Sequence, residues 1–127
     1  MSHGEDWECK CIEGHAQSPI SLPGPYGLKR INQGAEFEYD PVMANDVDVV
    51  FEDNIMKIKG EFGRIIDEDM TEYEAYEIQF HTPAEHQIGN KKFDLEVQVL
   101  HRAVTEGDFM KQAVVSVLFE RKAGAEN

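Results

Sequence analysis

Residues 76–101, YEIQFHTPAEHQIGNKKFDLEVQVLH, carry the pattern that decides the fold. Apolar and polar residues alternate in the first part, and the alternation resumes after a polar turn at residues 89–92. A period of two is typical of a half-buried β-strand, and two such runs around a turn predict neighbouring antiparallel strands. The apolar sides are Tyr76, Ile78 and Phe80 in the first run, and Phe93, Leu95, Val97 and Val99 in the second.

The opposite side of the two predicted strands is polar. If the strands pair, Gln79, His81, Glu96 and Gln98 face one space. This places metal-ligand-like and hydrogen-bonding side chains in a row on a rigid floor, which is how ligand sites are commonly built.

Two motifs resemble the α-class carbonic anhydrases. The run FHTPAEH at residues 80–86, followed by E-x-Q at 96–98, is similar to the zinc-site region of that family. Trp7 and Cys11, followed by QSPI at residues 17–20, are similar to its entrance segment, and the two motifs have the expected order and spacing. The resemblance implies a mostly β fold with an antiparallel or mixed sheet. It covers only the first half of the family fold, so residues 1–127 are expected to form one partial domain.

The resemblance also implies a degenerate zinc site. The family holds zinc with three histidines, and Gln79, His81 and Gln98 occupy those positions here. Imidazole is a good zinc donor, whereas a glutamine amide is a weak neutral oxygen donor. A zinc ion with one open position needs three protein ligands. No cofactor is therefore expected, and zinc is expected only if the site works in spite of its two glutamines.

The other histidines are not expected to replace the missing ligands. His101 lies three residues after Gln98, so strand parity puts it on the opposite face. His86 matches a structural residue of the family, and His3 and His15 lie outside any patterned segment. We expect surface or hydrogen-bonded structural roles for these four, and contacts of His81 with Gln79 and Gln98.

Three further residues match functional positions of the family but are not expected to keep the family's roles. Asn54 is the best match to the proton-shuttling histidine and cannot carry a proton at neutral pH. In the family, the counterpart of Glu85 serves a threonine from the second half, and that of Glu96 hydrogen-bonds the third zinc ligand. We expect both glutamates to be structural here, with Glu96 accepting a hydrogen bond from a neighbour.

The rest of the chain predicts further strands separated by loops. Strands are expected near residues 37–39, 47–51 and 55–59, with a turn at Asp53 and Asn54. Residues 21–34 are predicted to be loop, and residues 60–69 a connecting segment whose acidic cluster is a solvated turn. The apolar run 113–119 predicts a strand buried on both faces.

Composition narrows the possible partners. The 127 residues suit one domain, and the formal net charge of −13 argues against nucleic acid and anionic membrane surfaces. No apolar run suits a membrane-spanning helix, and the polar start predicts either a cytosolic chain or one that has lost a leader. Only one residue separates Cys9 from Cys11, which makes a mutual disulfide geometrically awkward. In secreted relatives the counterpart of Cys11 bonds to the second half, which favours a secreted parent protein.

These observations leave two classes of function open. The first is a binding or structural module, comparable to the acatalytic carbonic-anhydrase-related domains. The alternative is a zinc-dependent carbonate dehydratase with a degenerate site, or a fragment of one without a function of its own. Because the strand at 113–119 needs neighbours, we expect self-association by edge pairing or a protein partner, and acidity favours a basic one.

Overall fold

The computed structural model describes residues 18–27, 34–105 and 111–124, and within them the fold is mostly β. Two short 3-10 helices, η1 (Pro25–Gly27) and η2 (Ala44–Asp46), interrupt the strands. No helix in these ranges is long and apolar enough to cross a bilayer. The strands are β1 (Ser21–Leu22), β2 (Glu36–Tyr39), β3 (Asp48–Glu52), β4 (Ile55–Lys59), β5 (Gly63–Ile66), β6 (Glu72–His81), β7 (Gln87–Ile88), β8 (Leu95–Ala103) and β9 (Gln112–Phe119).

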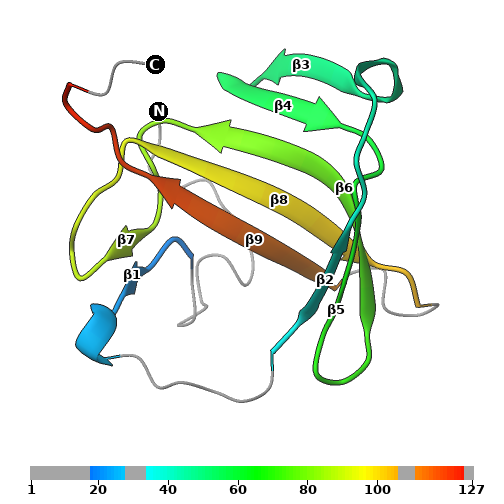
Figure 1. The fold of residues 1–127 in the computed structure, drawn as a ribbon, viewed down its shortest axis with the longest axis horizontal. Coiled ribbons are helices and arrows are strands. Elements are labelled where there is room, and N and C mark those ends of the chain that lie inside the picture. Colours follow the sequence, from blue (N-terminus) through cyan, green and yellow to red (C-terminus); the bar gives the residue numbers. More distant parts are fainter. Residues whose placement is uncertain (1–17, 28–33, 106–110, 125–127) are drawn as a thin grey trace, which may run out of the picture.

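Strand β6 organises a curled antiparallel sheet (Figure 1). One edge of β6 pairs with β8, and β9 continues the sheet beyond it. The other edge of β6 is shared by β4 near its end and by β5 near its start. Strand β3 pairs with β4, and β2 pairs with β5, so the sheet splits into two branches on this side. Strands β1 and β7 form a separate short parallel pair.

The predicted pairing of the central strands is confirmed. Gln79 lies opposite Gln98, and His81 lies opposite Glu96. The register shifts between Ala75 and Glu77, where β6 contains a bulge. A bulge reverses the parity of the side chains that follow it, so Ala75 and Ile78 both belong to the face of β6 that is opposite to the glutamines.

The predicted hairpin of residues 47–59 is also confirmed, with its first strand one residue later than predicted. Strands β3 and β4 pair from Asp48 opposite Lys59 to Glu52 opposite Ile55. Asp53 and Asn54 form the turn with φ angles of 53° and 62°. Aspartate and asparagine tolerate this left-handed region better than other residues with a side chain, and it matches the twist of two-residue hairpins.

Two predicted loop segments contain strands. Residues 63–66, predicted as part of a connection, form β5, and Arg64 joins it to both neighbours through Glu38 and Glu72. Residues 21–22, predicted as loop, pair with β7. Both strands were missed because two to four residues are too few to show an alternating pattern.

The prediction that residues 113–119 are buried on both faces is wrong. No residue of strand β9 is fully buried, and Val114, Val117 and Phe119 keep 51%, 47% and 47% of their surface exposed. Strand β8 covers one edge of β9, and among the described residues no other strand pairs with β9. An apolar run thus indicates which side chains of a strand could be buried. Whether they are buried depends on the elements that pack against the strand.

The buried core lies where the β5–β2 branch curls over the sheet. Phe62, Ile65, Ala75 and Ala103 are its buried apolar residues, and the fully buried His101 lies among the same strands. Tyr39 on β2 donates its hydroxyl to Nε2 of His101 at 2.9 Å, while Nδ1 donates to the Ala113 carbonyl at 3.2 Å. Burial lowers the pKa of His101, which favours the neutral ring that these two bonds require. His101 is therefore structural and lies on the face predicted for it.

Gly63 permits the close approach of β2 to β5. Its φ is +103°, and a Cβ atom there would overlap the carbonyl oxygen of Glu38 and lie 2.8 Å from Cα of Tyr39. We expect Gly63→Ala to lower the free energy of unfolding by about 2 kcal/mol or more, through strain and loss of β2 pairing. Chemical denaturation measures this. The matched control is Gly34→Ala, where a Cβ meets nothing within 4 Å. Equal effects of the two substitutions would contradict the close packing.

Candidate functional site

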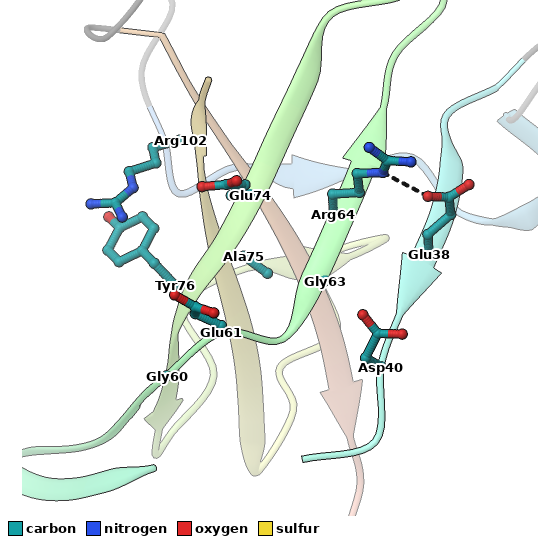
Figure 2. Close-up of a pocket in the computed structure, with 10 residues that line it drawn as sticks. All are labelled: Glu38, Asp40, Gly60, Glu61, Gly63, Arg64, Glu74, Ala75, Tyr76 and Arg102. Atoms are coloured by element: carbon teal, nitrogen blue, oxygen red, sulfur yellow. Dashed lines mark hydrogen bonds and ion pairs between the residues drawn. The ribbon is translucent and has the colours of Figure 1, made fainter. Parts of the chain in front are cut away.

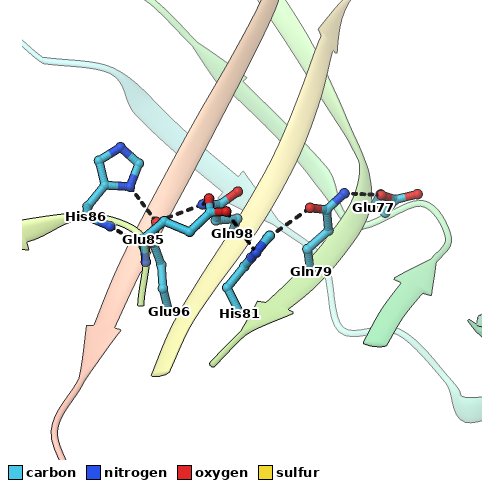
Figure 3. A network of polar contacts seen from close by, with 7 residues as sticks. All are labelled: Glu77, Gln79, His81, Glu85, His86, Glu96 and Gln98. Atoms are coloured by element: carbon cyan, nitrogen blue, oxygen red, sulfur yellow. Dashed lines mark hydrogen bonds and ion pairs between the residues drawn. The ribbon is translucent and has the colours of Figure 1, made fainter. Parts of the chain in front are cut away.

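A continuous polar network covers one face of the β6–β8 pair (Figure 3). Strand β6 contributes every second residue on this face, β8 contributes two residues opposite them, and the segment between β6 and β7 contributes two more. Strand alternation and register therefore bring these side chains together. The network consists of Glu77, Gln79, His81, Glu85, His86, Glu96 and Gln98.

The β6 half of the network is a directional chain. The amide nitrogen of Gln79 donates to Oε1 of Glu77 at 2.6 Å. Its amide oxygen consequently faces His81, whose Nε2 lies 3.0 Å away and donates to it. The other ring nitrogen, Nδ1, lies 3.4 Å from Oε1 of Glu85 and forms an ion pair when the ring is protonated. The neighbours of His81 are thus Gln79, as expected, and Glu85 in place of the expected Gln98.

The β8 half is centred on Glu96, which is fully buried. Its Oε2 accepts the backbone N–H groups of Glu85 and His86 at 2.8 and 2.9 Å. Its Oε1 accepts Nδ1 of His86 at 2.7 Å and Nε2 of Gln98 at 2.9 Å. Burial alone raises the pKa of this carboxyl, but the hydrogen bonds from His86, Gln98 and Ser116 outweigh it and lower the pKa to about 2.

Gln98 joins the two halves. Its amide nitrogen donates to Oε1 of Glu96 and, at 3.0 Å, to Oε2 of Glu85. Both glutamine amides therefore direct their N–H₂ groups at carboxylates, and the amides act as donors between acidic neighbours. Among the described residues, every buried side-chain nitrogen and oxygen has a hydrogen-bond partner. In the same ranges no three His, Cys, Asp or Glu side chains converge as a metal site would require.

The network borders an open cleft of about 580 Å³ between β8, β9 and the segment before β1. Its lining residues are Ser18, Pro19, Glu85, His86, Gln98, Val114 and Ser116. Ser116 and Val114 come from β9, which lies beside β8. The polar network is therefore accessible from one side, although its central carboxylate is buried.

A second cleft, of about 510 Å³, lies at the branch point of the sheet (Figure 2). Acidic residues dominate its lining, and its two arginines already have partners. Arg64 donates to Glu38 at 2.6 Å and to Glu72 at 2.9 Å, and the Arg102 guanidinium lies 5.3 Å from the Tyr76 ring centre. Sequence reasoning missed this cleft because its residues come from several strands and share no motif.

The predicted site residues lie in different parts of the structure. Gln79, His81, Glu96, Gln98 and Glu85 converge in the network, as described above. Asn54 lies at the exposed tip of the β3–β4 hairpin. The predictions on Trp7, Cys9, Cys11, His3 and His15 fall outside the described residues.

Two network members were not predicted as site residues. Glu77 fixes the orientation of the Gln79 amide, and its position two residues before Gln79 on an alternating strand signals the same face. His86 was expected to be structural, but its bond to Glu96 had no signal in the sequence, because ten residues and a loop separate them.

Comparison with known proteins agrees with this architecture. Dioscorin dioA3 of Dioscorea japonica is 34% identical over 121 residues, which cover 90% of this chain and 40% of that protein. Alpha carbonic anhydrase 7 of Arabidopsis thaliana is 32% identical over 128 residues, covering 91% of this chain and 40% of that protein. The crystal structure of dioscorin complexed with ascorbate matches at 30% identity with a TM-score of 0.71, over 87% of this chain and 44% of that one.

The chain belongs to the α-carbonic-anhydrase-like family. No protein-family model matches it. Carbonic anhydrase Cah3 of Chlamydomonas reinhardtii, solved with acetazolamide, shares the fold with a TM-score of 0.73 at 21% identity, over all of this chain and 53% of that one. This carbonic-anhydrase-like chain spans about 40% of the length of the curated relatives it matches.

The low pKa of Glu96 links the network to stability. A folded-state pKa of about 2, against an ordinary value of 4.5, stabilises the fold above pH 4.5, and this contribution is lost as the pH falls toward 2. Glu96→Gln should lower the free energy of unfolding by about 3 kcal/mol at pH 7, because it places an N–H₂ group among donors. The difference between the two proteins should shrink between pH 4.5 and 2 in urea titrations. A difference independent of pH would contradict this role of Glu96.

Proposed function

We propose that this chain is an acatalytic carbonic-anhydrase-like module whose polar network replaces a zinc centre, and that it acts by binding a protein partner. The observation that carries the proposal is the orientation of the two amides at Gln79 and Gln98. Each turns its N–H₂ group to a carboxylate. An N–H₂ group is a hydrogen-bond donor and offers no lone pair to a cation.

The donor set does not fit a tetrahedral zinc ion with an open position. Such a site needs three good donors, and His81 supplies the only imidazole among the three family ligand positions. Nε2 of that imidazole donates to the Gln79 oxygen, so its lone pair is not available while the bond is made. Binding a metal here would require the rupture of the Glu77–Gln79–His81 chain.

The carboxylates of the network are poor substitutes for the metal. Carbon dioxide hydration needs a hydroxide at neutral pH, which a metal supplies by lowering the pKa of bound water. A carboxylate with a pKa of about 2, such as Glu96, is too weak a base to deprotonate water at neutral pH. Its two oxygens already accept hydrogen bonds from Glu85, His86, Gln98 and Ser116.

In this proposal the network is a structural brace. It ties β6 to β8 through paired side chains, and it ties β8 to the segment before β7 through Glu96. A fully satisfied buried network rigidifies and specifies one arrangement of the strands. A rigid sheet is a suitable platform for recognition, and the net charge of −13 favours partners with basic surfaces.

The alternative is a zinc-dependent carbonate dehydratase with a degenerate site. It is favoured by similarity to proteins named as carbonic anhydrases, among them the one from Arabidopsis thaliana. In this alternative His81 and the two glutamine oxygens would have to hold zinc after both amides had rotated. Metal content and activity discriminate between the two proposals.

The purified chain is expected to contain far less than one zinc per molecule and to hydrate carbon dioxide no faster than background. The physical reason is the loss of two imidazole donors at Gln79 and Gln98. Mass spectrometric metal analysis after purification without added zinc, with stopped-flow hydration assays in added zinc, checks both points. Equimolar bound zinc together with measurable hydration would overturn the proposal.

Restoring the ligands should restore metal binding. Gln79→His and Gln98→His face each other across β6 and β8, so together with His81 they place three imidazoles around one point. We expect the zinc affinity of the double variant to rise by about two orders of magnitude or more, as measured by competition with a chelating dye. Asn54→His with Gln112→His adds two histidines away from the network and is the matched control. Equal affinity in the two double variants would contradict the assigned geometry.

A further inference from the structure

His101 is a fully buried titratable residue that takes no part in the polar network. Strand parity puts it on the other face of β8, where Ala75 of β6 and Ala113 of β9 lie directly opposite it. Both neighbours are alanines, so methyl groups flank the ring. The burial of the ring is complete within the described residues, and it therefore does not depend on any further part of the chain.

The two ring nitrogens of His101 connect three strands. Nδ1 lies 3.2 Å from the carbonyl oxygen of Ala113 on β9, and Nε2 lies 2.9 Å from the hydroxyl of Tyr39 on β2. A carbonyl only accepts, so Nδ1 carries the proton and Nε2 accepts the hydroxyl, which requires a neutral ring. The two rings also contact each other, with centroids 5.9 Å apart. We call Tyr39, His101 and Ala113 the latch.

Strand β2 relies on the latch because its other attachments are local. All four of its residues are exposed, and within the described ranges it pairs only with β5. Glu38 binds Arg64 on β5, and the N–H group of Asp40 donates to the Phe62 carbonyl at 3.2 Å. Neither contact reaches β8 or β9. Tyr39 is thus the residue through which β2 is bonded to the far side of the core.

The surroundings of the ring offer no countercharge. Besides Tyr39, the titratable groups on this face are Tyr73 on β6, whose hydroxyl donates to Asp67, and the exposed Lys111 beside β9. Strand β5 contributes apolar residues to this face. Burial lowers the pKa of His101, and hydrogen bonds with two backbone groups raise it by less. A protonated ring in the closed structure would therefore be a buried charge without a partner of opposite sign.

We propose that the latch is an acid-sensitive switch, in which protonation of His101 releases β2 from the sheet. In the open form Tyr39 leaves with β2, and the ring reaches water, which solvates its charge. Such a local opening costs less free energy than global unfolding, since only one short strand is released. The proposal is independent of the proposed function, because the latch and the polar network lie on opposite faces of β8.

Acid should favour the open form. The pKa of His101 lies below its ordinary value of 6.5 while the latch is closed, and it returns toward that value when the ring is exposed. The closed form is therefore most stable above pH 6.5. Below it, each unit of pH favours the open form about tenfold until the closed-form pKa is reached. The contribution of Glu96 is lost only below pH 4.5, so it does not overlap with this range.

Hydrogen exchange of the intact chain measures the opening directly. Protection factors of single amides, obtained by NMR at about pH 7.5 and about pH 5, remove the intrinsic effect of pH on exchange. Amides in the β2–β5 pair report release of β2, and amides in the β6–β8 pair report global unfolding. At the lower pH, protection of the β2–β5 amides should fall about tenfold or more, while that of the β6–β8 amides should stay within about twofold.

Three variants identify the proton that matters. His101→Gln stays neutral and offers an oxygen to the Tyr39 hydroxyl, so its β2 protection should not depend on pH. His81→Gln removes another buried histidine, on the polar face, and is the matched control in which the pH effect should persist. Tyr39→Phe keeps the ring and removes the bond, and it should lower β2 protection about fivefold at the higher pH. This last variant tests the latch even if His101→Gln does not fold.

The proposal fails if β2 is equally protected at the two pH values, or if Tyr39→Phe leaves its protection unchanged. It also fails if the pH effect survives in His101→Gln or disappears in His81→Gln, because the decisive proton would then bind elsewhere. Equal loss of protection in the β2–β5 and β6–β8 pairs would mean that acid unfolds the whole sheet, and that no separate latch exists.

Discussion

The buried carboxylate of Glu96 is the interaction on which the polar side of the structure depends. Hydrogen bonds reach its two oxygens from the strand that carries it, from the segment between β6 and β7, and from Ser116 on β9. A buried charge without such partners would be strongly destabilising, so the positions of His86, Glu85 and Gln98 follow from the need to satisfy it. Gln98 also donates to Glu85, and the carboxylate of Glu85 lies beside Nδ1 of His81, so the positions of these two residues are linked to that of Glu96.

The two faces of the central sheet have opposite characters, and strand alternation produces both at once. Every second side chain of β6 and β8 belongs to the polar network, in which each buried polar atom has a hydrogen-bond partner. The residues between them are apolar, and within the described residues only those at the core around Phe62 and His101 are fully buried. The polar side is therefore internally satisfied, while the apolar side chains of the described strands stay partly exposed. A proposed role in binding is consistent with this asymmetry.

Strong periodic signals made much of the fold predictable from the sequence. The β6–β8 pair and the β3–β4 hairpin were predicted because alternation and the Asp53–Asn54 turn act locally. Strands β1 and β5 were missed because they are short and depend on distant partners, as at Gly63 beside Glu38. At the site, register alone predicted the meeting of Gln79, His81, Glu96 and Gln98. The orientation of the amides was not predictable, because Glu77 and Glu85 set it through hydrogen bonds.

In the proposed function, the imidazole of His81 serves a hydrogen-bonded network in place of a metal. Nitrogen-15 NMR of the histidine rings tests it most directly, with assignment of His81 from a His81→Gln variant. The expected result is a protonated Nε2 bonded to the Gln79 oxygen, and a signal that does not move when equimolar zinc is added. A deprotonated Nε2 whose resonance shifts on addition of zinc would contradict it.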